Sequence, residues 1–162
     1  ERVENDFLSG IPDIFIGEDI LEAVKVTDIK SIWDYPGFLC KIHSGAANGN
    51  TEQLQGYGDI TGAKDLEVAN CLITMPETII NDYLFRLARK MDCVTTENPE
   101  YKLEAAKFEN SMRFDDIPKH QRVFKFKIEP FTDFERQALY DRVKVCRDWL
   151  CKFDEEYQIL NK

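Results

Sequence analysis

Two histidines and five cysteines offer the widest chemical repertoire in this sequence. His43 follows Cys40 by three residues in the segment FLCKIHS, and His120 is the other histidine. A tetrahedral zinc site needs four ligands at short, matched spacing. No second cysteine–histidine pair supplies the two ligands that Cys40 and His43 would leave missing. On a strand, this offset also sends Cys40 and His43 to opposite faces. The sequence therefore predicts neither a metal site nor a bound cofactor.

Nucleophilic catalysis by cysteine requires a thiolate beside an imidazole, and a third group that orients the imidazole. No spacing selects a cysteine partner for either histidine; the thiols are Cys40, Cys71, Cys93, Cys146 and Cys151. An odd number of irregularly spaced cysteines indicates reduced thiols in a reducing compartment. We therefore expect buried, apolar cysteine side chains in an intracellular protein of the cytoplasm or nucleus.

Acidic side chains cluster where a divalent metal is worth considering. A nuclease-like site requires a strand that carries an acid, a second acid and a lysine at short spacing. Lys64, Asp65 and Glu67 match that pattern poorly, and DITGAKDLE, which begins at Asp59, lacks the alternating oxygen ligands of a calcium loop. These acids are interpreted as solvated surface charge, and no residue is assigned a catalytic role.

Aromatic residues concentrate around one expected turn, SIWDYPGF, which contains Trp33, Tyr35 and Phe38. Exposed aromatic rings can clamp a cation or a peptide. The segment VKVTDIKSIWDYPGFLCKI, residues 24–42, resembles the opening strands of Tudor-type barrels, which bind methylated side chains in aromatic cages. The resemblance ends there, because the helices expected later do not continue the barrel pattern. Trp33 and Tyr35 are therefore candidate partner-binding residues.

The most regular apolar pattern lies near the C-terminus. Residues spaced alternately four and three apart form one stripe: Leu139, Val143, Cys146, Leu150, Phe153, Tyr157 and Leu160. A parallel homodimer would set Arg142 against Arg147, so the stripe does not specify one. A helix over residues 132–160 would be about 43 Å long, which is slightly more than the diameter of a compact domain of this size. We expect residues 139–150 to join the core, and Phe153, Tyr157 and Leu160 to face a partner.

Other patterns predict the elements that position these residues. Residues 24–43 are predicted to form a β-hairpin around Pro36. The glycine-rich segment 45–65 is predicted to be a loop or a set of short strands. Residues 66–73 and 122–131 are each predicted to form a strand, and the strand at 122–131 is expected at a sheet edge. Thr74 with Glu77 and Thr132 with Glu135 predict capping boxes, and Asn98 another helix start. The order predicts an α+β fold: an antiparallel sheet of about four strands, covered on one face by three helices, with a long C-terminal helix.

Length and charge limit the function. The 162 residues suit a single domain, residues 1–162, and because the chain begins with Glu1 we expect it to be excised from a longer protein. No apolar run is long enough to span a membrane, and the net charge of -9 disfavours a nucleic-acid partner. We expect a non-enzymatic protein–protein interaction or assembly domain of a larger intracellular or viral protein, with a protein partner. The alternatives are an enzyme of an unrecognised family with a site near residues 45–65, or an aromatic-turn reader of a modified peptide.

Overall fold

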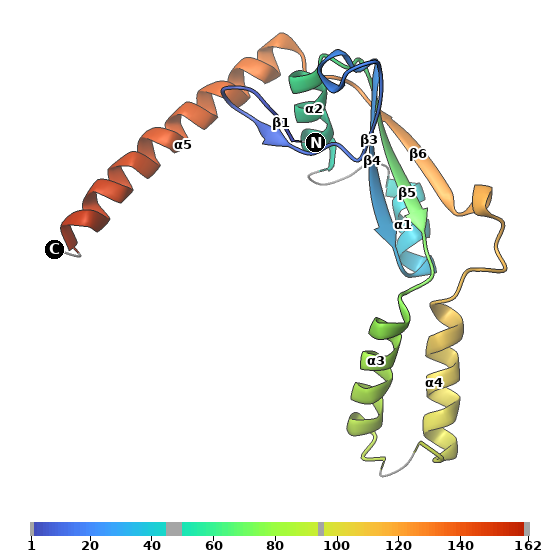
Figure 1. The fold of residues 1–162 in the computed structure, drawn as a ribbon. Helices are drawn as coiled ribbons and strands as arrows, with labels where there is room; N and C mark the ends of the chain where they lie inside the picture. Colours follow the sequence, from blue (N-terminus) through green and yellow to red (C-terminus); the bar gives the residue numbers. More distant parts are fainter. Residues whose placement is uncertain (1, 45–49, 94–95, 161–162) are drawn as a thin grey trace. The chain divides into compact units, whose positions relative to one another are not determined.

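The computed structural model describes residues 2–44, 50–93 and 96–160, without the side chains of residues 155, 156 and 158–160 (Figure 1). Five α-helices lie in these ranges: α1 (Tyr35–Ser44), α2 (Asn50–Thr61), α3 (Glu77–Lys90), α4 (Pro99–Ser111) and α5 (Asp133–Leu160). The strands are β1 (Val3–Glu4), β2 (Ser9–Gly10), β3 (Ile14–Ile16), β4 (Lys25–Ile32), β5 (Asp65–Leu72) and β6 (Val123–Ile128). Two short 3₁₀ helices, η1 (Ile20–Glu22) and η2 (Lys119–Gln121), complete the described elements.

Contacts divide the chain into two compact units. The first comprises residues 1–28, 49–67 and 127–162, and the second comprises residues 29–48 and 68–126. Each unit has buried apolar side chains of its own: Val26, Leu54 and Leu66 in the first, and Phe38, Leu72 and Phe114 in the second.

The main sheet is mixed, so the prediction of a purely antiparallel sheet is wrong. Its strand order is β3-β4-β5-β6, with β3 antiparallel to β4. β4 and β5 run parallel: Asp65 N donates to Val24 O at 3.3 Å in the first unit, and Ile73 N donates to Ile32 O at 2.9 Å in the second. Parallel strands need a long crossover connection, and the segment containing α1 and α2 provides it. β6 lies at the sheet edge, as predicted.

Helix α1 replaces the second strand of the predicted hairpin. Gly37 N donates to Asp34 Oδ1 at 2.6 Å, and Phe38 N donates to Asp34 O at 3.1 Å. Pro36 lies in the first turn, where a helix loses nothing from a missing N–H. Asp34 and Pro36 therefore start a helix here, and Phe38 packs in a core cluster with Leu72 and Phe114.

Helix α2 replaces most of the predicted glycine-rich loop; residues 45–49 lie outside the described residues. Its glycines permit close packing. A Cβ built on Gly58 would lie 2.8 Å from Leu66 Cδ1, whereas one built on Gly56 would lie 3.6 Å from Leu8 Cδ1. The glycine at 58 therefore lets α2 approach β5.

This difference predicts opposite effects for two alanine substitutions. Gly58→Ala is expected to lower the free energy of unfolding by about 1–2 kcal/mol, because overpacking at Leu66 outweighs the gain in helix propensity. Gly56→Ala, the matched control, is expected to raise it by up to about 1 kcal/mol, because its Cβ meets only an ordinary van der Waals contact. Urea denaturation of both variants measures the two values; equal effects would contradict the packing argument.

Helix starts were predicted with mixed success. Asn98 caps α4, accepting from Glu100 N at 2.8 Å, as predicted. The Thr132–Glu135 box is also confirmed, since Thr132 N donates to Glu135 Oε2 at 2.9 Å. The hydrogen bonds that Glu135 accepts from Thr132 lower the pKa of Glu135. The first predicted box is wrong: Pro76 occupies the N-cap of α3, and Thr74 Oγ1 instead donates to Asp115 Oδ2 at 3.2 Å.

Helix α5 has the predicted span, but much of its stripe is exposed. Leu139 and Val143 are half-buried, whereas Leu150 is 51% exposed and Cys146 is exposed, so the expectation of a core position is wrong for these two. All five cysteines are free thiols. The expectation that they are buried is wrong for Cys40, Cys146 and Cys151, which are exposed. Across the described residues, every helix is too short or too polar to traverse a lipid bilayer.

Candidate functional site

The register of β3 against β4 indicates that two aspartates lie opposite each other at the end of their pairing. The antiparallel register pairs Ile14 with Thr27 and Phe15 with Val26. Continuing it by one residue sets Asp13 opposite Asp28, on the same face of the sheet. Cα atoms of directly opposite residues lie about 4.5–5.5 Å apart. Asp28 is only 3% exposed, whereas Asp13 is exposed, so one carboxylate is anchored in the fold and the other is accessible to solvent.

A lysine follows on the same strand. Lys30 lies two residues after Asp28 on β4 and is half-buried. Side chains two residues apart on a strand project from the same face. The strand therefore carries an acid and a lysine side by side, with the second acid contributed by the segment that enters β3.

The donor set fits a hard divalent cation. No group of three or more histidine, cysteine, aspartate or glutamate side chains gathers to hold a metal within residues 2–44, 50–93 and 96–160. Mg²⁺ needs fewer protein ligands, because it keeps several waters and binds through one or two carboxylates together with substrate phosphates. Asp13 and Asp28 match that requirement, and they do not match the tetrahedral nitrogen and sulfur sites of zinc.

A polar pair lines a cavity near the same N-terminal segment. Gln53 Nε2 donates to Tyr57 Oη at 2.9 Å, along one side of α2. Both residues line a cavity of about 210 Å³ together with Leu8 and Ser9. Ser9 lies four residues before Asp13, so this cavity adjoins the segment that leads to the carboxylate pair.

The acids singled out from the sequence have a structural role. Lys25 Nζ contacts Glu67 Oε2 at 3.0 Å and Asp65 Oδ2 at 3.7 Å, and Glu67 is only 6% exposed. The hydrogen bond with Glu67 raises the pKa of Lys25. Asp59 is also buried, with a side chain 5% exposed beside Arg136. Their interpretation as solvated surface charge is therefore wrong for Glu67 and Asp59.

The predicted aromatic turn does not form a cage. Phe38 is buried at 3% exposure, whereas Trp33 and Tyr35 are 37% and 46% exposed. The second strand that the Tudor-type resemblance implies is helix α1. Partner binding by Trp33 and Tyr35 stays a prediction.

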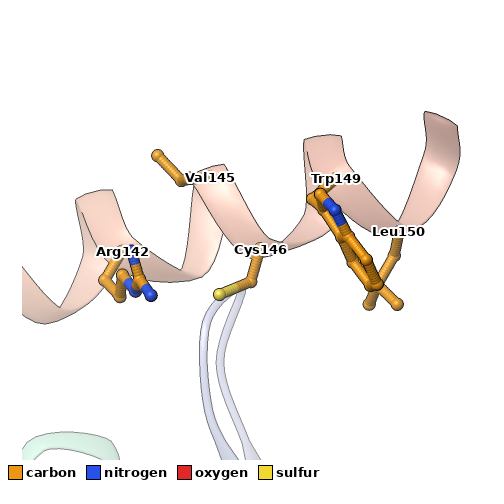
Figure 2. Close-up of a pocket in the computed structure, with 5 residues that line it drawn as sticks. All are labelled: Arg142, Val145, Cys146, Trp149 and Leu150. Carbon is orange, nitrogen blue, oxygen red and sulfur yellow. The ribbon is translucent and has the colours of Figure 1, made fainter. Parts of the chain in front are cut away.

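Two of the C-terminal candidates for partner binding, Phe153 and Tyr157, belong to an exposed stack of aromatic rings. Phe153 stacks between Trp149 and Tyr157, at centroid distances of 5.4 and 6.3 Å. Figure 2 shows the neighbouring part of α5, where five residues line a cavity of about 510 Å³: Arg142, Val145, Cys146, Trp149 and Leu150. The side chain of Leu160 lies outside the described residues. Partner binding by Phe153, Tyr157 and Leu160 also stays a prediction.

The residues of the carboxylate site were not predicted from the sequence. The expected pattern, a strand bearing an acid, a second acid and a nearby lysine, is a poor match at residues 64–67. The same pattern lies in VTDIKS, within the segment predicted as a strand from residue 24. Asp13, which follows Ile11 and Pro12, had no local signal that linked it to Asp28.

Comparisons with known proteins give one informative result. No family model matches the chain, and no curated protein matches it. Among solved structures, the fold is similar to that of a phage-related exonuclease from Haemophilus somnus 129PT, with a TM-score of 0.62 and 16% sequence identity. The match covers 97% of this chain and 60% of the exonuclease chain.

This likeness overturns two expectations from the sequence. It contradicts a non-enzymatic interaction or assembly domain and favours the enzyme alternative, and it contradicts the argument against a nucleic-acid partner. The net charge sums the whole surface, so it does not by itself exclude a local contact with a phosphate group. Over 97% of its length, the chain shares the fold of this exonuclease.

Proposed function

We propose that this chain is a metal-dependent nuclease that hydrolyses phosphodiester bonds of nucleic acid at Asp13, Asp28 and Lys30. One observation carries the proposal: the strand register, continued by one residue beyond Ile14 and Thr27, sets Asp13 opposite Asp28, and Lys30 follows two residues later on the same strand. The fold shared with an exonuclease supports it.

Each residue has a role that follows from its position. Asp13 and Asp28 would hold a divalent cation, which when bound supplies Lewis-acid polarisation of the phosphate and activates water. Burial of Asp28 at 3% exposure fixes one carboxylate, while exposed Asp13 leaves the site open to substrate. Lys30 would donate hydrogen bonds to the phosphate oxygen on which negative charge develops, an interaction that strengthens in the transition state.

Hydrolysis by the purified chain tests the proposal. End-labelled linear DNA, single- and double-stranded, is expected to be degraded in Mg²⁺ or Mn²⁺. Cleavage should stop in EDTA and return when excess metal is restored, because the carboxylates alone cannot activate water. Closed circular DNA distinguishes cleavage from an end from internal cleavage. A folded chain that cleaves no nucleic acid in either metal, or one that still cleaves in EDTA, would contradict the proposal.

A further inference from the structure

Helix α5 carries an apolar face that is open to solvent. Its members are Cys146, Trp149, Leu150, Phe153 and Tyr157; the last four are 48–60% exposed, and Cys146 is also exposed. The three aromatic rings stack in a row along the helix. Figure 2 shows the side chains of Cys146, Trp149 and Leu150 on one side of α5 together with Arg142, where they line the cavity of about 510 Å³. Contiguous apolar surface of this kind marks an interaction site.

The other side of the helix holds α5 to its own unit. Tyr140 stacks on Phe7 with ring centroids 3.9 Å apart, and Arg147 donates to Asp6 O at 2.5 Å. At 3.6 residues per turn, Tyr140 and Arg147 lie about 160–180° around the helix from Trp149. The apolar face is therefore on the side of α5 away from these contacts, where another molecule can reach it.

The accessible area of the apolar face suits a small specific interface. An aromatic side chain can bury about 150–250 Å². Because about half of each ring is accessible here, the three rings alone expose about 300 Å² per copy. With Cys146, Leu150 and the stem of Arg142 added, two such faces would bury roughly 1,000 Å², the size at which specific interfaces begin.

We propose that the apolar face of α5 binds the same face of a second copy of this chain, with the two helices antiparallel and crossing at Trp149. Using one patch twice closes the assembly as a twofold dimer. This proposal goes beyond the proposed nuclease function and does not depend on it.

The position of Arg142 favours the antiparallel arrangement. At 1.5 Å per residue, Arg142 lies about 10 Å from the crossing point, between the levels of Phe153 and Tyr157 of the second copy, at about 6 and 12 Å. A guanidinium group is attracted to the face of an aromatic ring, so each end of the dimer pairs a cation with rings. A parallel pair would instead set Arg142 against Arg147, and like charges repel.

Sedimentation equilibrium of the purified chain in reducing buffer tests the proposal, because reduced cysteines cannot link two chains. The wild type is expected to dimerise reversibly with a Kd on the order of 10 µM, in keeping with a small interface. Trp149→Glu is expected to raise Kd at least about 30-fold, since it removes a central aromatic anchor. A wild type that stays monomeric up to millimolar concentration would overturn the proposal.

Another exposed ring of α5 provides the matched control for Trp149. Phe134 is 83% exposed and lies about 22 Å from Trp149 along the helix. Phe134→Glu introduces the same charge outside the apolar face and should change Kd less than about twofold. Equal effects of the two substitutions would overturn the proposal. Should Trp149→Glu fail to fold, Tyr157→Ala, near the end of the helix, is expected to raise Kd in its place, and an unchanged Kd would overturn the proposal.

Arg142→Glu tests the orientation of the two helices. In the antiparallel dimer it is expected to raise Kd about 5- to 30-fold, because a cation is lost at both ends. In a parallel dimer it would relieve the repulsion with Arg147 and lower Kd, which would overturn the antiparallel arrangement. Lys107→Glu makes the same charge change at an exposed lysine of α4 and should alter Kd less than about twofold.

Nucleic acid is the competing occupant of the apolar face, because exposed aromatic rings can stack on bases. A monomeric wild type that binds a single-stranded oligonucleotide, and binds it less tightly after Trp149→Glu, would assign the face to nucleic acid and overturn the dimer. Absence of metal-dependent hydrolysis contradicts only the proposed function, since dimerisation is measured without substrate.

Discussion

Asp28→Asn is expected to lower kcat about a thousandfold while the protein stays folded. A bound divalent cation contributes several kcal/mol of transition-state stabilisation, and a loss of about 4 kcal/mol corresponds to about three powers of ten in rate. Asparagine has nearly the shape of aspartate and fits the same 3%-exposed position. It also removes the repulsion between two adjacent carboxylates, so Tm should equal or exceed that of the wild type. Single-turnover cleavage and thermal unfolding measure the two quantities.

A nearby acid provides the control for Asp28. Glu18→Gln removes the same charge from an exposed position shortly after β3, and kcat should stay within about twofold, since exposed charges contribute little. Metal binding gives a second measurement that does not need activity. Mn²⁺ should raise the Tm of the wild type and of Glu18→Gln, but not that of Asp28→Asn, because only a ligand bound to the folded state stabilises it. A fully active Asp28→Asn chain would refute the site.

Asp59→Asn is expected to be the most destabilising of the single changes considered, by about 2–4 kcal/mol. The Asp59 side chain is 5% exposed, forms an ion pair with Arg136, and accepts a hydrogen bond from Tyr140 on α5. Removing one partner of a buried pair usually costs 3–5 kcal/mol; the value here is reduced because Arg136 is 31% exposed. Urea denaturation measures the loss.

The same arginine supplies the matched control for Asp59. Arg136 also pairs with Asp133 at 2.7 Å, but that carboxylate is 99% exposed. Asp133→Asn should therefore change the free energy of unfolding by less than about 0.5 kcal/mol. Equal effects at the two positions would contradict the argument from burial.

The Asp59 cluster also predicts how stability depends on pH. Burial, and next the hydrogen bond to Asp59, raise the pKa of Tyr140 above its ordinary value of 10.0. Because the folded chain holds this proton more tightly than the unfolded chain, the contribution of Tyr140 to stability is fully present below pH 10. It is lost as the pH rises through the raised pKa.

Local patterns were sufficient for those elements whose signals lie within a few residues. Residues 66–73 and 122–131 were predicted as strands and contain β5 and β6, and a periodic apolar stripe predicted α5. Asn98 and Thr132 begin their helices as expected, because a cap is a hydrogen bond to a backbone two or three residues away. The same kind of reasoning failed at Pro36, because proline and glycine suit both a tight turn and a first helical turn. Burial of Phe38 against Leu72 and Phe114 decided for the helix.

Local sequence patterns could not predict the candidate site, for a related reason. The placement of Asp13 opposite Asp28 depends on the register of β3 against β4. By itself, the sequence determined the periodic elements, their caps and the α+β class, since hydrophobic spacing and backbone hydrogen bonding act over short stretches. Only the tertiary structure decided the mixed sheet, the two crossover helices and the meeting of the two carboxylates, because strand register is set by packing between segments distant in the chain.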